Sequence, residues 1–186
     1  MRPRLILASR SPQRSAILEQ LGIPFAARVP EVEELDAGPP YEVAVENAYR
    51  KARAAAEGLT EVPVLGVDTV VAVEAAIYGK PGDRQQARAT LQALSGRRHA
   101  VIGGLCLLSS EGQSRTAAAT TTVVFRALDR RLLEWYLDSE EWRQRAGGYA
   151  IQGRGAALVK RIEGDYLNVV GLPLAALLEL MPELVG

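Results

Sequence analysis

The sequence predicts an α/β protein in which strands and helices alternate along the chain. Short apolar runs rich in β-branched residues, such as residues 64–73, have the composition of buried strands. Segments with a helical spacing of apolar residues, such as residues 41–57, separate these runs. A third observation is the pair of β-rich segments at residues 99–108 and 114–125, which flank a polar turn and predict a long hairpin.

Size and charge set the limits of the fold and of its partners. A chain of 186 residues can bury one full hydrophobic core, so we expect residues 1–186 to form a single domain. Lys and Arg together number 22, as do Asp and Glu, so no overall basic charge favours nonspecific nucleic-acid binding. One Cys and one His allow neither an internal disulfide nor a Cys/His zinc cluster. The first apolar run, residues 5–8, is too short for a signal peptide or a membrane span, so we expect a soluble, cytoplasmic protein.

The first predicted strand, residues 4–8, leads through a polar stretch into a helix. This junction presents free backbone N–H groups and the positive end of the helix dipole. Ser9, Ser11 and Arg14 lie beside it, and all three side chains suit phosphate oxygens. The junction therefore predicts an anion-binding loop. The alternative is an ordinary helix start, with Ser11 as the N-cap and Pro12 at the first helical position.

A charged segment and a helix follow the next short predicted strand. The acidic run at residues 30–36 is either solvated surface or a source of ligands for a hard divalent cation. In the helix predicted at residues 41–57, the alanines share one face, and Lys51 falls on the same stripe, seven residues after Ala44. Lys51 must therefore reach the edge of the core or meet an anionic partner inside a cleft, and the sequence leaves both alternatives open.

One carboxylate, Asp68, lies in the middle of the apolar run 64–73. Burying even a neutral polar group without a partner costs roughly 2–7 kcal/mol, so a metal, water or ligand must compensate an ionised one. The alternative is that Gly66 breaks the run and Asp68 turns the chain between two strands. The turn at residues 78–81 then places a second lysine, Lys80, where it can reach the same site.

Most of the remaining residues are predicted to support the fold rather than to take part in the chemistry. Cys106 and His99 lie in the hairpin strands, where a buried thiol and a structural imidazole are expected rather than a nucleophile. Trp135 and Trp142 each suit either the core or a subunit contact, so a homodimer is one of the open alternatives. The remaining predicted elements are a helix from the N-cap Asp83 to Gly96, a helix after Asp129, a strand at residues 157–162 and a closing helix at residues 173–181.

The glycine-rich segment at residues 146–156 is not a dinucleotide-binding fingerprint, although its glycines permit close approach of the backbone to a ligand. Gln152 in this segment carries both a donor and an acceptor, which suits the recognition of a nucleobase edge. The alternative is that the segment is simply a set of turns.

Five motifs follow one another along the chain: LASRSPQR at residues 7–14, KA at 51–52, GVDT at 66–69, GKP at 79–81 and GYAIQG at 148–153. Taken in this order, they resemble the Maf family of nucleotide pyrophosphatases over nearly the whole chain. The resemblance implies a mixed twisted sheet with flanking helices and two lobes around a cleft, as in the inosine triphosphate pyrophosphatases. It also implies hydrolysis of a nucleoside triphosphate to monophosphate and pyrophosphate, with a divalent cation such as Mg²⁺ or Mn²⁺.

The resemblance also implies residue roles. Thr69 and Gln152 match the branch that acts on dTTP and UTP, whereas the branch that acts on 7-methyl-GTP typically has Gln at the first of these positions. Gln13 departs from the family, which usually has Arg there, and a neutral amide cannot grip phosphate as Arg does. The implied catalytic residues are Asp68, Lys51 and Lys80, the implied substrate contacts are Ser9, Gln13, Arg14, Thr69 and Gln152, and the implied metal ligand is Glu34.

The expected activity is therefore the hydrolysis of dTTP and UTP, or of modified pyrimidine nucleotides, as house-cleaning of the nucleotide pool. The expected partner is a small-molecule nucleotide, with no nucleic acid and no membrane. Two alternatives remain open: a 7-methyl-GTP-type pyrophosphatase, and a nucleotide-binding regulator of cell division that does not turn its ligand over.

Overall fold

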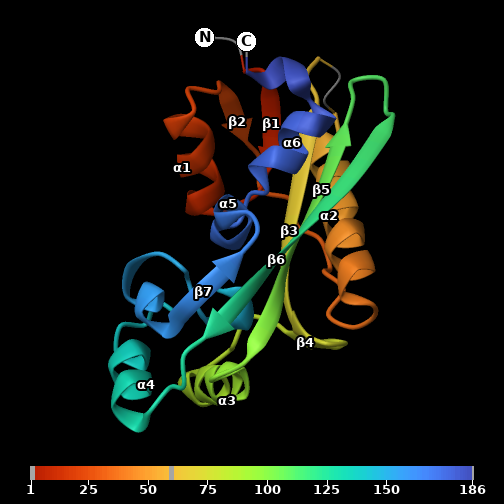
Figure 1. The fold of residues 1–186 in the computed structure, drawn as a ribbon. Coiled ribbons are helices and arrows are strands. Elements are labelled where there is room, and N and C mark those ends of the chain that lie inside the picture. Colours follow the sequence, from red (N-terminus) through yellow and green to blue (C-terminus); the bar gives the residue numbers. More distant parts are fainter. Residues whose placement is uncertain (1–2, 59–60, 186) are drawn as a thin grey trace.

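The strands form one twisted mixed sheet in the computed structural model, which describes residues 3–58 and 61–185 (Figure 1). Within the described residues the strand order is β2-β1-β3-β5-β6-β7, and β4 pairs with β3. The pairs β1–β2 and β1–β3 are parallel and the others are antiparallel. Met1 and Arg2, at the predicted start, lie outside the described residues. The strands are β1 (Leu5–Ala8), β2 (Phe25–Ala27), β3 (Val64–Val73), β4 (Ala76–Tyr78), β5 (Arg98–Leu108), β6 (Ser114–Phe125) and β7 (Val159–Glu163).

Helices cover both faces of this sheet. Helix α2 lies on one face, α1, α5 and α6 lie on the other, and α3 and α4 lie at the end opposite to the two termini (Figure 1). No helix within the described ranges is long and apolar enough to cross a membrane. The helices are α1 (Pro12–Gln20), α2 (Pro40–Ala56), α3 (Arg84–Leu94), α4 (Arg130–Leu137), α5 (Tyr166–Val170) and α6 (Leu174–Leu180), with short 3₁₀ turns at Ala146–Gly148, Gly153–Leu158 and Pro182–Leu184.

Strand β1 is buried on both sides because its alternate side chains meet different helices. Leu5 and Leu7 belong to the core shared with α1 and α6, whereas Ile6 and Ala8 pack against the alanines of α2. Successive side chains of a strand point to opposite faces, so a strand covered by helices on both faces is apolar at every position. This is why the short, continuously apolar run at residues 5–8 indicates a buried strand. Both strands of the predicted hairpin and the predicted helices are present, and α5 is a short helix that the sequence analysis did not predict.

Glycines let α2 lie unusually close to the sheet. A Cβ added at Gly66 of β3 would overlap the carbonyl oxygen of Ala48, and one added at Gly104 of β5 would overlap that of Ala44. The backbone of α2 thus rests almost directly on β3 and β5, with small residues on both sides of the contact. This close approach brings Lys51, in the same helix, to the middle of β3.

Strand β3 has a stretch of unpaired edge. Its pairing with β1 ends at Gly66, and its pairing with β4 on the same edge begins at Val71. Among the described residues, 67–70 therefore have no strand neighbour on that edge, while β5 pairs along the other edge. Asp68 and Thr69 lie in this gap, on opposite faces of the strand.

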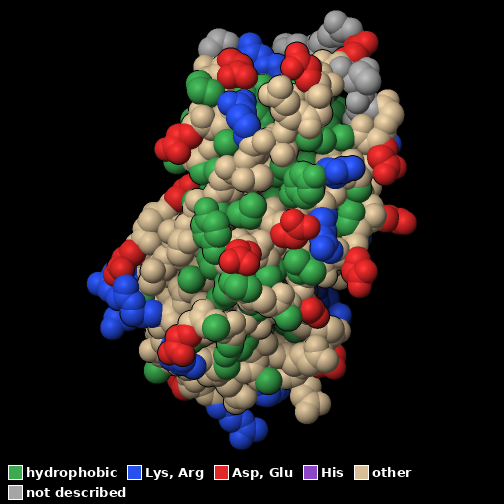
Figure 2. Space-filling model, turned by 90° about the vertical axis from the view of Figure 1, so that its right-hand side faces the viewer, with side chains coloured by type: hydrophobic (Ala, Val, Ile, Leu, Met, Phe, Trp, Pro, Cys, Tyr) green, Lys and Arg blue, Asp and Glu red, His purple; other side chains and the backbone are tan. Residues whose placement is uncertain are grey.

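The surface shows no concentration of one charge on the face that looks to the right in Figure 1. On that face, acidic and basic side chains are interspersed, with hydrophobic side chains between them (Figure 2).

Of the two tryptophans, Trp142 is buried and its indole N–H donates to the carbonyl oxygen of Leu137. Trp135 is exposed, and the guanidinium of Arg154 lies over its ring at 5.3 Å. A homodimer remains a prediction.

Candidate active site

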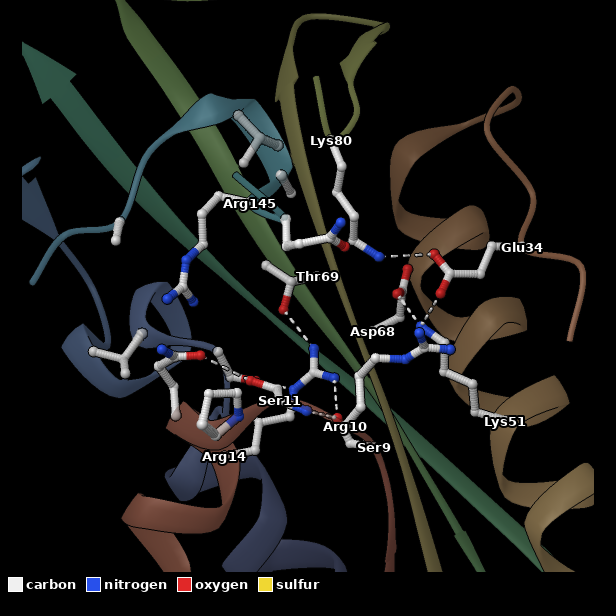
Figure 3. Close-up of a pocket in the computed structure, with 18 of the residues that line it drawn as sticks. Ser9, Arg10, Ser11, Arg14, Glu34, Lys51, Asp68, Thr69, Lys80 and Arg145 are labelled. Atoms are coloured by element: carbon white, nitrogen blue, oxygen red, sulfur yellow. Dashed lines mark hydrogen bonds and ion pairs between the residues drawn. The ribbon is translucent and has the colours of Figure 1, made fainter. Parts of the chain in front are cut away.

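A cavity of about 1110 Å³ opens where β3 has its unpaired edge. The loop between β1 and α1, the acidic segment before α2, the turn after β4, the glycine-rich loop and the end of α5 contribute its walls (Figure 3). The structure therefore brings together segments from almost the whole length of the chain. All the site residues predicted from the sequence line this cavity: Ser9, Gln13, Arg14, Glu34, Lys51, Asp68, Thr69, Lys80 and Gln152.

Two carboxylates converge on one lysine at the floor of the cavity (Figure 3). The Nζ atom of Lys51 lies 2.6 Å from Oδ1 of Asp68 and 2.9 Å from Oε1 of Glu34. Asp68 is 5% exposed and Lys51 is 8% exposed, so this ion pair is largely removed from water. The anionic partner predicted as one alternative for Lys51 is thus present. Asp68 lies within β3 rather than in a turn, which excludes the other interpretation of that residue.

Glu34 is the outer member of this group. Its Oε2 atom lies 3.4 Å from Nζ of Lys80, which is half exposed at the rim. Burial alone raises the pKa of Glu34, but the charges and hydrogen bonds of Lys51 and Lys80 together outweigh it and lower the pKa below its ordinary value. Glu34 is therefore ionised at neutral pH and paired with both lysines.

Arg14 connects three walls of the cavity. Its Nε atom donates to the carbonyl oxygen of Gly171 at 2.8 Å, Nη1 to Oγ of Ser9 at 2.9 Å, and Nη2 to Oγ1 of Thr69 at 3.0 Å. Burial lowers the pKa of Arg14, opposed by the negative charges of Asp68 and Glu34. A guanidinium has five N–H groups, so two remain available to a ligand while three hold the walls in place.

The loop before α1 is held by short-range bonds. The backbone N–H of Ser11 donates to Oγ of Ser9 at 3.1 Å, and the hydroxyl of Ser11 donates to Oε1 of Gln13 at 3.2 Å. Ser11 occupies the N-cap position and Pro12 the first helical position, as in the ordinary helix start, yet the Ser11 side chain does not cap the helix. The first turn of α1 therefore has no side-chain cap from Ser11, and Pro12, Gln13 and Arg14 of this turn line the cavity. Both facts support the anion-binding interpretation.

The glycine-rich loop forms the wall opposite Glu34. Gly147 and Gly148 adopt left-handed conformations, with φ of 68° and 67°, and a Cβ at Gly147 would press on the side chain of Val71. The loop turns sharply enough here to place Tyr149 and Gln152 along the cavity. Gln152 is exposed, so its amide is accessible to a ligand.

Several residues at the site were not found from the sequence. Asn47 donates to Oδ2 of Asp68 at 3.1 Å, and its position one helical turn before Lys51 was an available signal. Arg10 and Arg145 also line the cavity, and their side chains make no hydrogen bond or ion pair within the described part of the chain. The Arg145 side chain extends from the glycine-rich loop into the cavity on the side of Ser11 (Figure 3). An isolated Arg in a loop carries no sequence pattern that distinguishes it from a surface residue.

An α/β fold with a large cavity, lined by lysines, a buried arginine, paired carboxylates and the start of a helix, is typical of proteins that bind phosphorylated small molecules. The chain belongs to the Maf family, because the family model described as Maf-like protein matches residues 4–184. The predicted family is thus confirmed.

Relatives and solved structures agree with this assignment. A dTTP/UTP pyrophosphatase of Symbiobacterium thermophilum is 44% identical over 182 residues, which cover 97% of this chain and 93% of the relative. A dTTP/UTP pyrophosphatase of Pyrococcus furiosus is 41% identical, covering 96% and 94% of the two chains. The structure of a HAM1 protein from Coxiella burnetii superposes with a TM-score of 0.52 at 22% identity, over 69% of this chain and 76% of that one. This likeness confirms the predicted fold class.

Proposed function

We propose that this protein hydrolyses dTTP and UTP to the nucleoside monophosphate and pyrophosphate. Relatives that carry this activity in their names align over nearly the entire chain. The observation that carries the proposal is the convergence of Asp68 and Glu34 on Lys51 inside a cavity large enough for a nucleotide. Thr69 and Gln152, which match the dTTP/UTP branch, line the same cavity.

In the proposed reaction, the oxygen of a water molecule forms a bond to the α-phosphorus. The bond from that phosphorus to the oxygen bridging to the β-phosphorus breaks, and pyrophosphate leaves with this oxygen. Asp68 accepts the proton of the water as a general base. Each of its oxygens already accepts one hydrogen bond, from Lys51 and from Asn47, and a carboxylate has further acceptor positions for the water.

Positive side chains would stabilise the charge that develops on the phosphoryl oxygens. Lys51 and Lys80 lie on the Glu34 side of the cavity, and the two remaining N–H groups of Arg14 lie on the Thr69 side. A triphosphate placed across the unpaired edge of β3 would contact all three cations. Gln13 adds no charge at the start of α1, where its amide is bonded to Ser11.

The donor set at this site fits a divalent cation such as Mg²⁺ or Mn²⁺. Among the described residues there is no group of three or more His, Cys, Asp or Glu side chains placed to hold a metal. Mg²⁺, however, is commonly held by one or two carboxylates together with substrate phosphates and water. Glu34 and Asp68 would hold the ion in this way. When bound, it would supply positive charge to the phosphates and acidity to a coordinated water.

The test is a panel of nucleoside triphosphates assayed for pyrophosphate release with Mg²⁺ or Mn²⁺. The proposal expects dTTP and UTP to give the highest kcat/KM, with monophosphate formed in equal amount. Preference for 7-methyl-GTP would overturn the assignment to this branch. Nucleotide binding in calorimetry without turnover would identify a nucleotide-binding regulator instead.

The position of attack has a separate test. Hydrolysis of UTP in water enriched in oxygen-18 places the label in UMP if the α-phosphorus is attacked, and in pyrophosphate if the β-phosphorus is attacked. Mass spectrometry of the two products distinguishes these outcomes, and label in pyrophosphate would contradict the proposed mechanism.

A further inference from the structure

Asn47 is a buried amide next to the active site. It lies in α2, one helical turn before Lys51, and is 2% exposed. Its side chain makes three hydrogen bonds that join α2 to two other segments. Asn47 is not among the residues that line the cavity, so it acts on the site only through its neighbours.

Two of these bonds go to a single backbone residue. The N–H of Leu35 donates to Oδ1 of Asn47 at 2.7 Å, and Nδ2 of Asn47 donates to the carbonyl oxygen of Leu35 at 3.0 Å. This pairing imitates the backbone bonds between two strands, and it also determines which end of the amide is oxygen and which is nitrogen. Leu35 follows Glu34 directly, so the two bonds hold the backbone from which the Glu34 carboxylate projects.

Side chains rather than regular structure hold the acidic segment in place. Residues 28–36 form no helix and no strand, so their backbone groups lack the partners that regular structure provides. Side chains connect the segment to α2 and its end. Arg28 donates to the carbonyl oxygens of Ala55 and Glu57 at 2.9 and 2.7 Å. Arg50 donates to the carbonyl oxygen of Glu33 at 3.3 Å, and Lys51 pairs with the Glu34 carboxylate. The two bonds from Asn47 hold both backbone groups of Leu35, and they are shorter than the contact of Arg50 with Glu33.

The third bond reaches the other carboxylate. Nδ2 of Asn47 donates to Oδ2 of Asp68 at 3.1 Å, while Lys51 holds Oδ1 of the same group at 2.6 Å. With a donor on each oxygen, the Asp68 carboxylate is fixed in rotation as well as in position. Asn47 therefore bonds both to the Asp68 carboxylate and to the backbone of Leu35, the residue after Glu34.

We infer that Asn47 is a positioning residue that sets the spacing and orientation of the two active-site carboxylates, Glu34 and Asp68. Preorganised groups contribute to catalysis only if their geometry is held before the substrate arrives, and a displacement of about 1 Å can cost about 10²-fold in rate. The catalytic part of this inference depends on the proposed hydrolysis. The structural part, that Asn47 holds Leu35, does not.

The experiment compares Asn47→Ala with Asn47→Asp. Asn47→Ala removes all three bonds. Asn47→Asp keeps the volume and the acceptor for the Leu35 N–H, but it loses the donated bonds to the Leu35 carbonyl oxygen and to Asp68 and places a second carboxylate against Asp68. The matched control is Thr121→Val, because Thr121 is also fully buried and its hydroxyl bonds to Asp165 and Asn168 without touching either active-site carboxylate.

The first readout is the rate of pyrophosphate release from UTP, measured below the thermal midpoints of all variants. We expect both Asn47 variants to lower kcat about tenfold or more while changing KM for UTP less, and Thr121→Val to stay within about threefold of the unmutated protein. An equal loss of kcat in Asn47→Ala and Thr121→Val would overturn the inference, since Asn47 would then act only on stability.

The second readout is amide hydrogen exchange, which does not require activity. Exchange at the Leu35 N–H should accelerate at least about tenfold in Asn47→Ala and remain unchanged in Thr121→Val. Unchanged exchange at Leu35 in Asn47→Ala would overturn the inference whatever the kinetics show. A protein that releases no pyrophosphate from any nucleotide would instead refute the proposed function, and exchange at Leu35 would still decide the role of Asn47.

Discussion

The ammonium group of Lys51 lies 2.6 Å from Oδ1 of Asp68, and this contact joins helix α2 to strand β3 at the floor of the cavity. A buried ion pair of this kind is costly to break from one side, because the remaining charge stays in a poorly solvated place. Here a second carboxylate, Glu34, approaches the same ammonium at 2.9 Å and shares its charge. If Asp68 alone loses its charge, the Glu34 carboxylate therefore still neutralises the charge of Lys51.

This arrangement makes Asp68→Asn an informative substitution. The fold should be retained, because Asn has the same volume and Lys51 still has Glu34 as a partner. Turnover of UTP should fall about 10²-fold or more, because the amide cannot accept the proton of the attacking water. Circular dichroism checks the fold and pyrophosphate release checks the rate. Turnover close to that of the unmutated protein would remove Asp68 from the mechanism.

Arg14→Lys tests the connection between the cavity walls. Lysine keeps the charge but presents a single nitrogen, which cannot reach Gly171, Ser9 and Thr69 together. At least one buried acceptor then loses its partner, at a cost of about 1–3 kcal/mol in the free energy of unfolding. Urea denaturation measures this loss. A stability equal to that of the unmutated protein would show that the three bonds are not a structural connection.

Gly66→Ala tests the close packing of α2. The new methyl group would overlap the carbonyl oxygen of Ala48, so α2 must move away from β3 and take Lys51 with it. We expect a loss of about 1–3 kcal/mol in stability, as for other overpacked cores, together with reduced turnover. Gly79→Ala is the control for stability, because a Cβ there meets no atom within 4 Å. Equal thermal midpoints for the two variants would contradict this account of the packing.

His99 provides a test by pH. It is 3% exposed, its Nε2 atom lies 2.8 Å from the hydroxyl of Tyr149, and Phe125 packs edge-on against its ring. Burial lowers the pKa of His99 from 6.5 to about 4. Between these two values the unfolded chain binds a proton that the folded protein resists. The contribution of His99 to the free energy of unfolding is therefore complete above about pH 6.5. It falls by about 3 kcal/mol as the pH drops to about 4.

The measurement for His99 is the free energy of unfolding at pH 7, 5.5 and 4 for the unmutated protein and for His99→Phe. The variant should be less stable at pH 7, because it loses the bond to Tyr149, but its stability should fall less steeply with acid. Parallel curves for the two proteins would mean that His99 does not titrate across this range.

Local sequence was sufficient for most of the secondary structure and for the chemistry of the site. The strand 64–73, the helix 41–57 and the hairpin were predictable because their apolar spacing matches a buried strand or a helix face, and the structure confirms them. Asp68 and Lys51 were recognisable for the same reason, since each places a charge at a position where the pattern demands an apolar residue. The short helix α5 was missed because five residues are too few to show a helical period.

By itself, the sequence determined the Maf family membership and the set of charged residues available to a phosphorylated ligand. The family resemblance implied Glu34 within the acidic run, but only the tertiary structure showed that its carboxylate contacts Lys51. Only the structure also showed that three N–H groups of Arg14 bond to the protein and that Asn47 bonds to both Leu35 and Asp68. Each of these facts depends on contacts between segments separated by many residues in the chain. The unpaired edge of β3 depends on where β1 ends and β4 begins, and no local pattern encodes that register.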